Sequence, residues 1–198
     1  MSATSLTELT LAEFLRRLGS DDPTPGGGSS AALVGALAAA LGRKVIRFTL
    51  GKPRFAEVEP HVRMLGQRLA RAESLLDALI DEDANAYSVL SAALKRDRSD
   101  PDRAAAVEQA AAVAGYVPLE TAATCAAVLD ELRQVRRLGN PMLRSDADAA
   151  IHLAQAALLA AAANVRVNLA LMRQGDAAEV ERQLEAILSK YVGDRSGA

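Results

Sequence analysis

The amino-acid sequence predicts an all-α fold, an antiparallel bundle of about six or seven helices in a single domain covering residues 1–198. Half of the residues are hydrophobic but only 3% are aromatic, and alanine and leucine supply most of the apolar content. Strands are normally rich in β-branched and aromatic residues, so this composition favours closely packed helices. Strand-type alternation does not occur, and glycine and proline punctuate a pattern that is helical throughout.

Capping and breaking residues set the expected limits of each helix. Thr10 and Glu13 form a capping box that opens a short first helix. The run from Gly115 to Pro118 is expected to break or kink the chain, because proline removes a helical hydrogen bond. Ser145 is expected to cap a later helix, with Asp148 at the capping-box position. The remaining helices are predicted over residues 30–50, 57–94, 100–114, 119–138, 145–173 and 176–191.

Charge and cysteine content restrict the class of protein. The formal net charge of −2 provides no basic field to attract nucleic acid, so no nucleic-acid partner is expected. Cys125 is the single cysteine, which rules out an internal disulfide and fits a reducing compartment. No signal-peptide pattern opens the chain, and the apolar stretch at residues 31–42 is too short to span a bilayer. We therefore expect a cytoplasmic protein without membrane contact.

A run of prolines and glycines precedes the second predicted helix. Two prolines fix φ and three glycines release it, so a loop of defined shape ends where the helix begins. The first N–H groups of that helix have no helical acceptor, and the missing side chains allow a ligand such as a carboxylate to approach the main chain. A tight linker with a helix N-cap is an equal alternative. The candidate binding residues here are Pro25, Gly26, Gly27, Gly28 and Ser29.

Asp83 is the most unusual charged residue of the chain. It lies on the apolar stripe of the third predicted helix, together with Leu76, Ile80, Tyr87, Leu90 and Leu94. A carboxylate on an apolar face costs stability unless it is paired, and its pKa tends to rise, which suits general acid/base chemistry near neutral pH. A buried salt bridge or a hydrogen bond between helices is the alternative. The neighbouring acids, among them Asp81, are expected on a solvated face.

Other polar residues are weaker candidates. Asn164 and Asn168 share a helix face and could orient a polar ligand or bond a neighbouring helix. Lys52 stands beside the end of the second predicted helix, where it could stabilise the helix dipole or bind an anionic substrate tail. Ser145 and Asp146 begin a later helix and fit a capping role.

Several common site types are absent from the sequence. His61 and His152 have no Cys, Asp or Glu at metal-ligand spacing, so no metal is assigned. The sequence contains neither a Ser-His-Asp order nor a P-loop lysine pattern. The glycine run lacks the preceding strand that a dinucleotide-binding fingerprint requires.

Six collinear motifs resemble the cyclodeaminase domain of formiminotransferase-cyclodeaminase and the related methenyltetrahydrofolate cyclohydrolases. The resemblance extends from about residue 11 to residue 171. The motifs are Pro23-Thr24-Pro25-Gly26-Gly27-Gly28-Ser29, Gly51-Lys52-Pro53-Arg54-Phe55, Asp81-Glu82-Asp83-Ala84-Asn85-Ala86-Tyr87, Val117-Pro118-Leu119, Gly139-Asn140 followed by Ser145-Asp146, and Asn164-Val165-Arg166-Val167-Asn168.

The resemblance implies a helical domain that forms a homodimer, with a folate pocket near the dimer interface. It implies that Asp83, the second aspartate of the D-x-D motif, is the catalytic acid/base. The glycine loop, Lys52, Asp146, Ser145 and the asparagines Asn140, Asn164 and Asn168 would then be pocket candidates. The alanine-rich faces of two helices also exceed what a small bundle needs to bury, which agrees with dimerisation.

Three functions remain open at the level of the sequence. The first is cyclodeamination of 5-formiminotetrahydrofolate to 5,10-methenyltetrahydrofolate and ammonia, with Asp83 relaying a proton. The second is cyclohydrolase activity on the same site, in which water opens the methenyl ring. The third is a non-catalytic helical dimer that binds a folate or a protein partner. Neither enzymatic reaction requires a cofactor, and the tetrahydrofolate derivative is the substrate.

Overall fold

The computed structural model describes residues 5–191. Within these residues the chain forms six α-helices and three short 3₁₀-helices, and no strand. In chain order they are η1 (Leu6–Glu8), α1 (Leu11–Leu18), α2 (Gly27–Arg47), η2 (Pro53–Phe55), α3 (Glu59–Leu94), α4 (Arg103–Leu138), η3 (Pro141–Leu143), α5 (Arg144–Leu169) and α6 (Gln174–Tyr191). The predicted all-α class and number of helices are confirmed.

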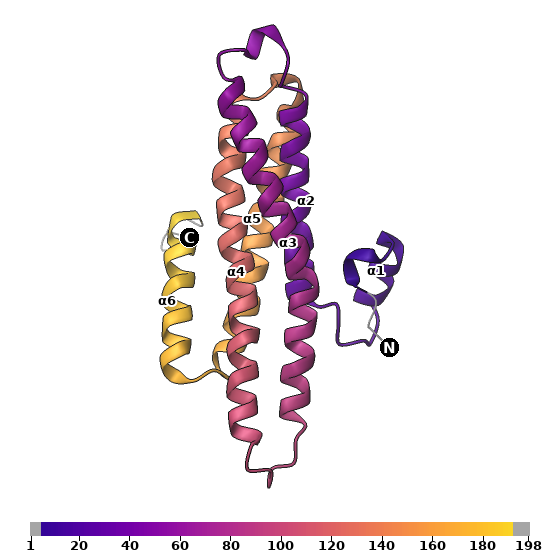
Figure 1. Ribbon diagram of the computed structural model, residues 1–198, viewed down its shortest axis with the longest axis vertical. Helices are drawn as coiled ribbons and strands as arrows, with labels where there is room; N and C mark the ends of the chain where they lie inside the picture. The colour runs from indigo at the N-terminus through magenta and orange to yellow at the C-terminus, as the bar shows by residue number, and fades with distance from the viewer. Residues whose placement is uncertain (1–4, 192–198) are drawn as a thin grey trace, which may run out of the picture.

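The four long helices α2 to α5 run alternately up and down and form the body of the molecule (Figure 1). The turn at η2 and the turn at η3 lie together at one end, where α2 passes into α3 and α4 into α5. The shorter α6 packs along α4, whereas α1 stands outside the bundle next to the lower half of α2 and α3. Consecutive long helices are therefore antiparallel neighbours.

Leucines on α3 and α4 and small residues on α2 build the core. Leu65, Leu69, Leu76 and Leu79 of α3 are fully buried. Glycines of α2 allow close approach, because a Cβ at Gly42 would lie 2.3 Å from a methyl carbon of Leu132. The low aromatic content of the sequence is thus compensated by close contacts between helix backbones.

The predicted break at Gly115 to Pro118 is wrong, since α4 continues through Pro118 without interruption. Proline at position 118 has no N–H to bond the carbonyl of Ala114, four residues earlier. The side-chain amide of Asn168 on α5 donates to that carbonyl at 2.7 Å. A polar group from the neighbouring helix therefore satisfies the acceptor that proline leaves open, and α4 stays continuous.

Several predicted helix starts differ from the structure, two of them next to candidate site residues. α2 begins at Gly27, inside the glycine run, and its N-cap is Gly26. α5 begins at Arg144 with Leu143 as its N-cap, so Ser145 lies in the first turn and does not cap the helix. Asp148 is paired with Arg136 of α4 instead of closing a capping box. In both places interactions between helices outweigh the local capping preference.

By length and composition alone, three helical segments are long and apolar enough to cross a membrane. From residues 31–42 alone, no such segment was expected. The three segments are Gly27–Arg47, Arg103–Leu138 and Pro141–Leu169. In the bundle, 50%, 61% and 39% of their most apolar windows are buried against the rest of the chain. Much of this hydropathy therefore serves the packing of the helices against one another.

The bond between Asn168 and the Ala114 carbonyl leads to a double-mutant prediction. Asn168→Ala should lower the free energy of unfolding by about 1–2 kcal/mol, because the carbonyl loses its donor. In a Pro118→Ala background the loss should be smaller, since the new N–H of residue 118 can bond Ala114. Urea unfolding of the four proteins measures the coupling. Equal losses in the two backgrounds would contradict this account of α4.

Candidate active site

A cavity of about 220 Å³ lies where the N-terminus of α2 meets α3, α4 and α5. Asp83 is the one charged residue among those that line it in the described chain. Backbone of the glycine run forms one wall, α3 a second, and α4 with α5 a third. The lining residues are Pro23, Thr24, Gly26, Gly27, Gly28, Asp83, Ala86, Tyr87, Leu90, Ala114, Asn164, Val167 and Asn168.

Ser29 holds the Asp83 carboxylate by two contacts to a single oxygen. The Ser29 backbone N–H donates to Asp83 Oδ2 at 2.7 Å, and the Ser29 hydroxyl lies 2.9 Å from the same oxygen. The hydroxyl is also 3.0 Å from the Ile80 carbonyl, so its single proton is shared between two acceptors. Asp83 Oδ1 accepts no hydrogen bond from the described residues and is the oxygen left for a ligand.

Gly28 makes room for this carboxylate. A Cβ added at Gly28 would lie 1.9 Å from Asp83 Oδ1 and 2.4 Å from its carboxyl carbon. No side chain can occupy that position without displacing Asp83. The carboxylate therefore sits directly on the first turn of α2, where the unpaired N–H groups and the positive end of the helix dipole favour a negative charge.

Burial raises the pKa of the Asp83 carboxyl above its ordinary value, because desolvation disfavours the charged form. The two contacts from Ser29 act in the opposite direction and lower the pKa, but the desolvation is larger. An acid with a raised pKa can both accept and return a proton near neutral pH. The expectation of an Asp83 with a raised pKa on an otherwise apolar stripe thus agrees with the structure.

Asn164 and Asn168 of α5 both line the cavity, as their shared face predicted. Asn168 donates to the carbonyls of Ala114 and Asn164, so its Oδ1 remains as an acceptor. Asn164 donates to Ala160, and its amide lies about 3.0 Å from where a Cβ of Gly27 would be. The two amides thus place polar atoms opposite the glycine run.

Pro25 and Ser29 are brought to the site but not into the cavity. Pro25 is buried and follows a cis peptide bond. Ser29 is fully buried and touches Asp83, so it orients the carboxylate and does not face a ligand. Asp81 is also more than a solvated residue, because it binds the Ser5 hydroxyl and accepts from the Leu6 N–H at 2.7 Å.

The other predicted site residues gather at the far end of α2. Lys52 places its ammonium 5.9 Å from the ring centre of the exposed Phe48. Asp146 pairs with Lys44 at 2.8 Å, and Ser145 is exposed beside it. α2 has 21 residues, so its two ends are about 30 Å apart. A single copy of the chain therefore does not bring these residues to Asp83.

Asn140 joins the two turns at this far end. It is 4% exposed, its Oδ1 accepts from Arg54 at 2.6 Å, and its Nδ2 donates to the Phe48 carbonyl at 3.1 Å. The Asn140 backbone N–H donates to the Thr49 hydroxyl at 2.9 Å. These bonds fix the loop that carries Lys52 and Arg54 at this end of the bundle.

Sequence reasoning missed several lining residues. Thr24, Ala114 and Val167 line the cavity but carry no chemical signal of their own. Val167, with 75% of its surface exposed, marks the rim as apolar and open to the outside. Among the described residues, no group of three or more His, Cys, Asp or Glu side chains could hold a metal ion.

Comparison with known proteins identifies the family of this chain. Residues 10–187 match the family model described as formiminotransferase-cyclodeaminase. The chain belongs to the formiminotransferase-cyclodeaminase family. It is similar in structure to a formiminotetrahydrofolate cyclodeaminase from Thermotoga maritima, with a TM-score of 0.78 and 27% identity over 92% of this chain and 93% of the other.

Family members similar in sequence carry two different activities in their names. A methenyltetrahydrofolate cyclohydrolase from Methylorubrum extorquens is 34% identical over 91% of this chain and 89% of its own length. The formimidoyltransferase-cyclodeaminase of Mus musculus is 32% identical over 83% of this chain, which spans only 31% of the mouse protein. The family is thus one of folate one-carbon enzymes, and the similarities include both reactions.

The raised pKa of Asp83 predicts a pH-dependent stability difference between the wild type and Asp83→Asn. Where the native pKa exceeds the unfolded one, the native state binds more protons, so the free energy of unfolding falls as the pH rises through that interval. Asparagine does not titrate. Asp83→Asn should therefore gain stability relative to the wild type as the pH rises above the ordinary pKa of an aspartic acid, about 4. Urea unfolding across this range tests the sign, and a wild type that gains relative to the variant would contradict it.

Proposed function

We propose that this protein is a formimidoyltetrahydrofolate cyclodeaminase in which Asp83 is the general acid/base. The observation that carries the proposal is the Asp83 carboxylate itself. Asp83 lines the cavity, one of its oxygens is fixed by Ser29, the other accepts no hydrogen bond from the described residues, and burial raises the pKa of the carboxyl. The similarity to the Thermotoga maritima cyclodeaminase along nearly the whole chain supports this reaction.

The reaction joins N10 to the formimino carbon and moves one proton from N10 to the imino nitrogen, which then leaves. N10 of the protonated 5-formiminotetrahydrofolate attacks the formimino carbon and forms the new C–N bond. Asp83 Oδ1 takes the proton from N10 and delivers it to the former imino nitrogen, which leaves as ammonia. The 5,10-methenyl cation remains. A carboxylate held on the first turn of a helix can make both transfers without moving.

Cyclohydrolase activity is the second candidate, favoured by the match to nearly the whole length of the Methylorubrum extorquens enzyme. Here Asp83 would take a proton from water as its oxygen attacks the methenyl carbon. Returning that proton to N5 breaks the bond between N5 and the former methenyl carbon, and loss of the remaining hydroxyl proton to solvent leaves 10-formyltetrahydrofolate. The demand on the carboxylate is the same, so the geometry of Asp83 suits both reactions.

Assays with both substrates and an Asp83→Asn variant test these proposals. Methenyl absorbance should appear from 5-formiminotetrahydrofolate together with ammonia, whereas loss of that absorbance from the methenyl substrate marks the cyclohydrolase. Asp83→Asn should lower kcat by about 10²- to 10⁴-fold. The matched control is Glu82→Gln, which removes an exposed carboxylate one residue away. An Asp83→Asn enzyme as fast as the wild type would refute the catalytic role. Folate binding without turnover in either protein would favour a binding module.

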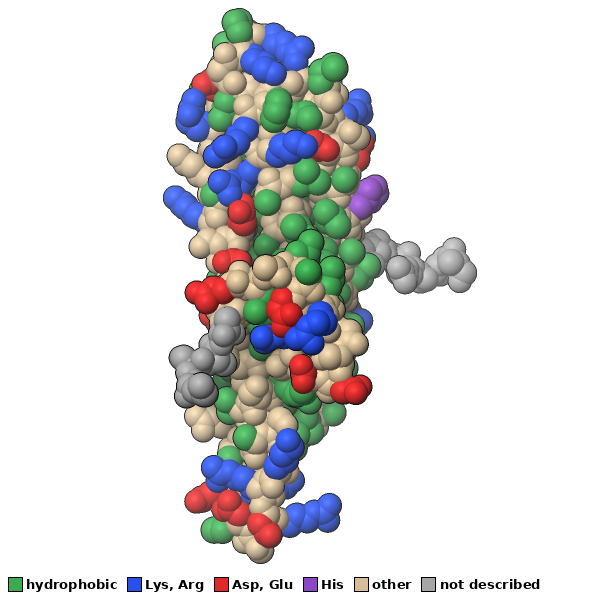
Figure 2. Space-filling view, turned by 90° about the vertical axis from the view of Figure 1, so that its right-hand side faces the viewer, with side chains coloured by type: hydrophobic (Ala, Val, Ile, Leu, Met, Phe, Trp, Pro, Cys, Tyr) green, Lys and Arg blue, Asp and Glu red, His purple; other side chains and the backbone are tan. Residues whose placement is uncertain are grey.

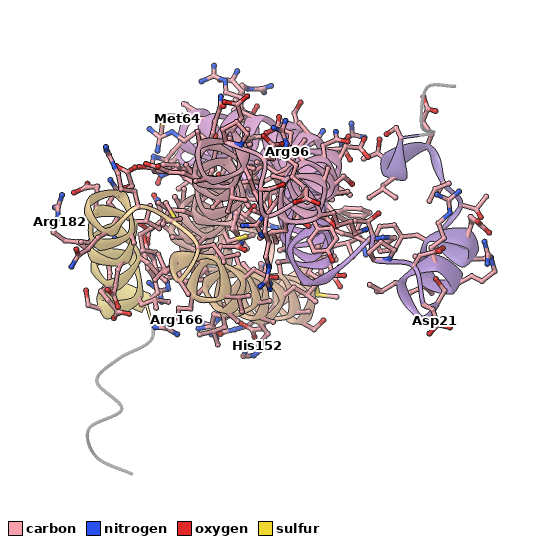
Figure 3. The ribbon with its side chains drawn as sticks, turned by 90° about the horizontal axis from the view of Figure 1, so that it is seen from below. Asp21, Met64, Arg96, His152, Arg166 and Arg182 are labelled. Carbon is pink, nitrogen blue, oxygen red and sulfur yellow. The ribbon has the colours of Figure 1, made fainter. Side chains whose placement is uncertain are left out.

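A homodimer is part of the proposal, because one copy keeps the predicted site residues Lys52 and Asp83 about 30 Å apart. The outer face of α5 exposes Leu159 by 42% and Val167 by 75%. His152, seven residues before Leu159 on the same face of α5, points away from the bundle (Figure 3). A second copy packed antiparallel on this face would bring its Lys52 loop to the cavity of the first. Lys52 and Arg54 could then bind the anionic tail of the folate.

Hybrid dimers test whether the two ends of α2 act together. Asp83→Asn and Lys52→Ala variants should each be impaired. After unfolding and refolding as an equal mixture, about a quarter of wild-type activity should return, because half of the dimers are hybrids and each hybrid has one intact site. Variants refolded separately and then combined without exchange are the control. A co-refolded mixture no more active than this control would contradict a shared site.

A further inference from the structure

The wall of the cavity formed by α4 and α5 is polar without being charged. Charged side chains are spread over the outer surface that Figure 2 shows, whereas this wall consists of Ala114, Asn164, Val167 and Asn168. The two asparagine amides are its polar side chains. An amide carries a donor group at one end and an acceptor at the other. The way in which each amide is turned therefore decides which chemistry a ligand meets on this wall.

Two carbonyl groups settle how the Asn168 amide is turned. Its Nδ2 lies 2.7 Å from the Ala114 carbonyl oxygen on α4 and 3.2 Å from the Asn164 carbonyl oxygen on α5. If the amide were turned over, its oxygen would face two acceptors with no proton between them, which is unfavourable. Oδ1 of Asn168 accepts no hydrogen bond from residues 5–191, so this oxygen is the polar atom that Asn168 offers to the cavity.

Pro118 keeps the Ala114 carbonyl available for this amide. In a continuous helix that carbonyl would accept the N–H of residue 118, but proline has none. The Asn168 amide is the donor that takes its place. Pro118 itself is buried and is not among the residues that line the cavity. It can therefore influence a ligand in this cavity through Asn168.

The Asn164 amide is turned in the same sense. Its Nδ2 donates to the Ala160 carbonyl at 2.8 Å, and its Oδ1 has no donor in the part of the chain that the structure describes. Side chains four residues apart on a helix have Cβ atoms about 5–6 Å apart. An amino nitrogen that donates through two N–H bonds at about 2.9 Å joins acceptors that are about 5 Å apart. One amino group thus matches the spacing of the oxygens of Asn164 and Asn168.

We propose, on the basis of the function proposed above, that Pro118 is a positioning residue for substrate recognition. By freeing the Ala114 carbonyl it turns the Asn168 amide, so that the oxygens of Asn164 and Asn168 accept together from the 2-amino group of the pterin ring. This group is the primary amine of a reduced folate, and it lies at the edge of the ring away from N5 and N10. The reactive end of the substrate then faces Asp83 on α3, while the amino edge faces α5.

Binding of a folate and of an analogue without the amino group tests the inference. The probes are 5-formyltetrahydrofolate and the same molecule with a methyl group in place of the 2-amino group, each titrated by calorimetry. The wild type should bind the first about 100-fold more tightly, because the analogue loses two hydrogen bonds of about 10-fold each. In Pro118→Ala the new N–H of residue 118 bonds the Ala114 carbonyl and the Asn168 amide is no longer held. The preference should then fall to about 10-fold or less.

Steady-state kinetics separates positioning from a general structural effect. Pro118→Ala should raise KM for 5-formiminotetrahydrofolate by about 10-fold and leave kcat within about two-fold, because the contacts between Asp83 and Ser29 are untouched. A general loss of structure would lower kcat as well. The matched control is Glu120→Ala, at an exposed position two residues further along α4, which should keep the preference of about 100-fold.

The outcomes distinguish this inference from the proposed function. Equal preferences in the wild type and Pro118→Ala would overturn the inference and leave the proposed function standing. A wild type that binds both probes with the same affinity would do the same. A wild type that binds neither probe and turns over neither folate substrate would overturn the proposed function, and the role of Pro118 with it.

Discussion

The contact between the Asp83 carboxylate and the first turn of α2 organises this end of the molecule. It requires glycine at position 28, because any side chain would occupy the place of the carboxyl group. The chain before α2 turns sharply away, so the loop of residues 19–26 and α1 lie outside the bundle (Figure 1). One ionic group thus determines where α2 begins, how closely α2 approaches α3, and where the cavity opens.

Local pattern was enough to predict the helical class, most helix positions and the importance of Asp83, since each rests on spacing along one helix. It failed where a distant residue decides the outcome. Pro118 does not break α4, because Asn168, fifty positions later, supplies the missing hydrogen bond. Ser29 resembles a ligand-binding residue of the glycine run, but its burial against Asp83 depends on the packing of α2 on α3.

Motif order along the chain likewise says little about distance in space. Asp83 and Lys52 lie in neighbouring family motifs, but they stand near opposite ends of α2, about 30 Å apart. The resemblance grouped Asp83 and Lys52 because both fall within motifs similar to those of the family. The structure shows that, within one copy, the antiparallel bundle keeps Asp83 and Lys52 apart. In the proposed reaction, a substrate with a compact ring and a long anionic tail would use both regions, with the second supplied by the proposed two-fold partner.

The chemistry of Asp83 depends on a balance between two opposing effects of the same packing. Burial raises the pKa toward the range useful for proton transfer, while the Ser29 contacts that fix the carboxylate lower it. Stronger anchoring by further donors would orient the group better but leave it too weak a base. Placing both contacts on Oδ2 resolves the conflict, because Oδ1 remains without a donor among the described residues. Gly28, which also lines the cavity, then matters chemically as well as sterically, since it adds no side chain over this second oxygen.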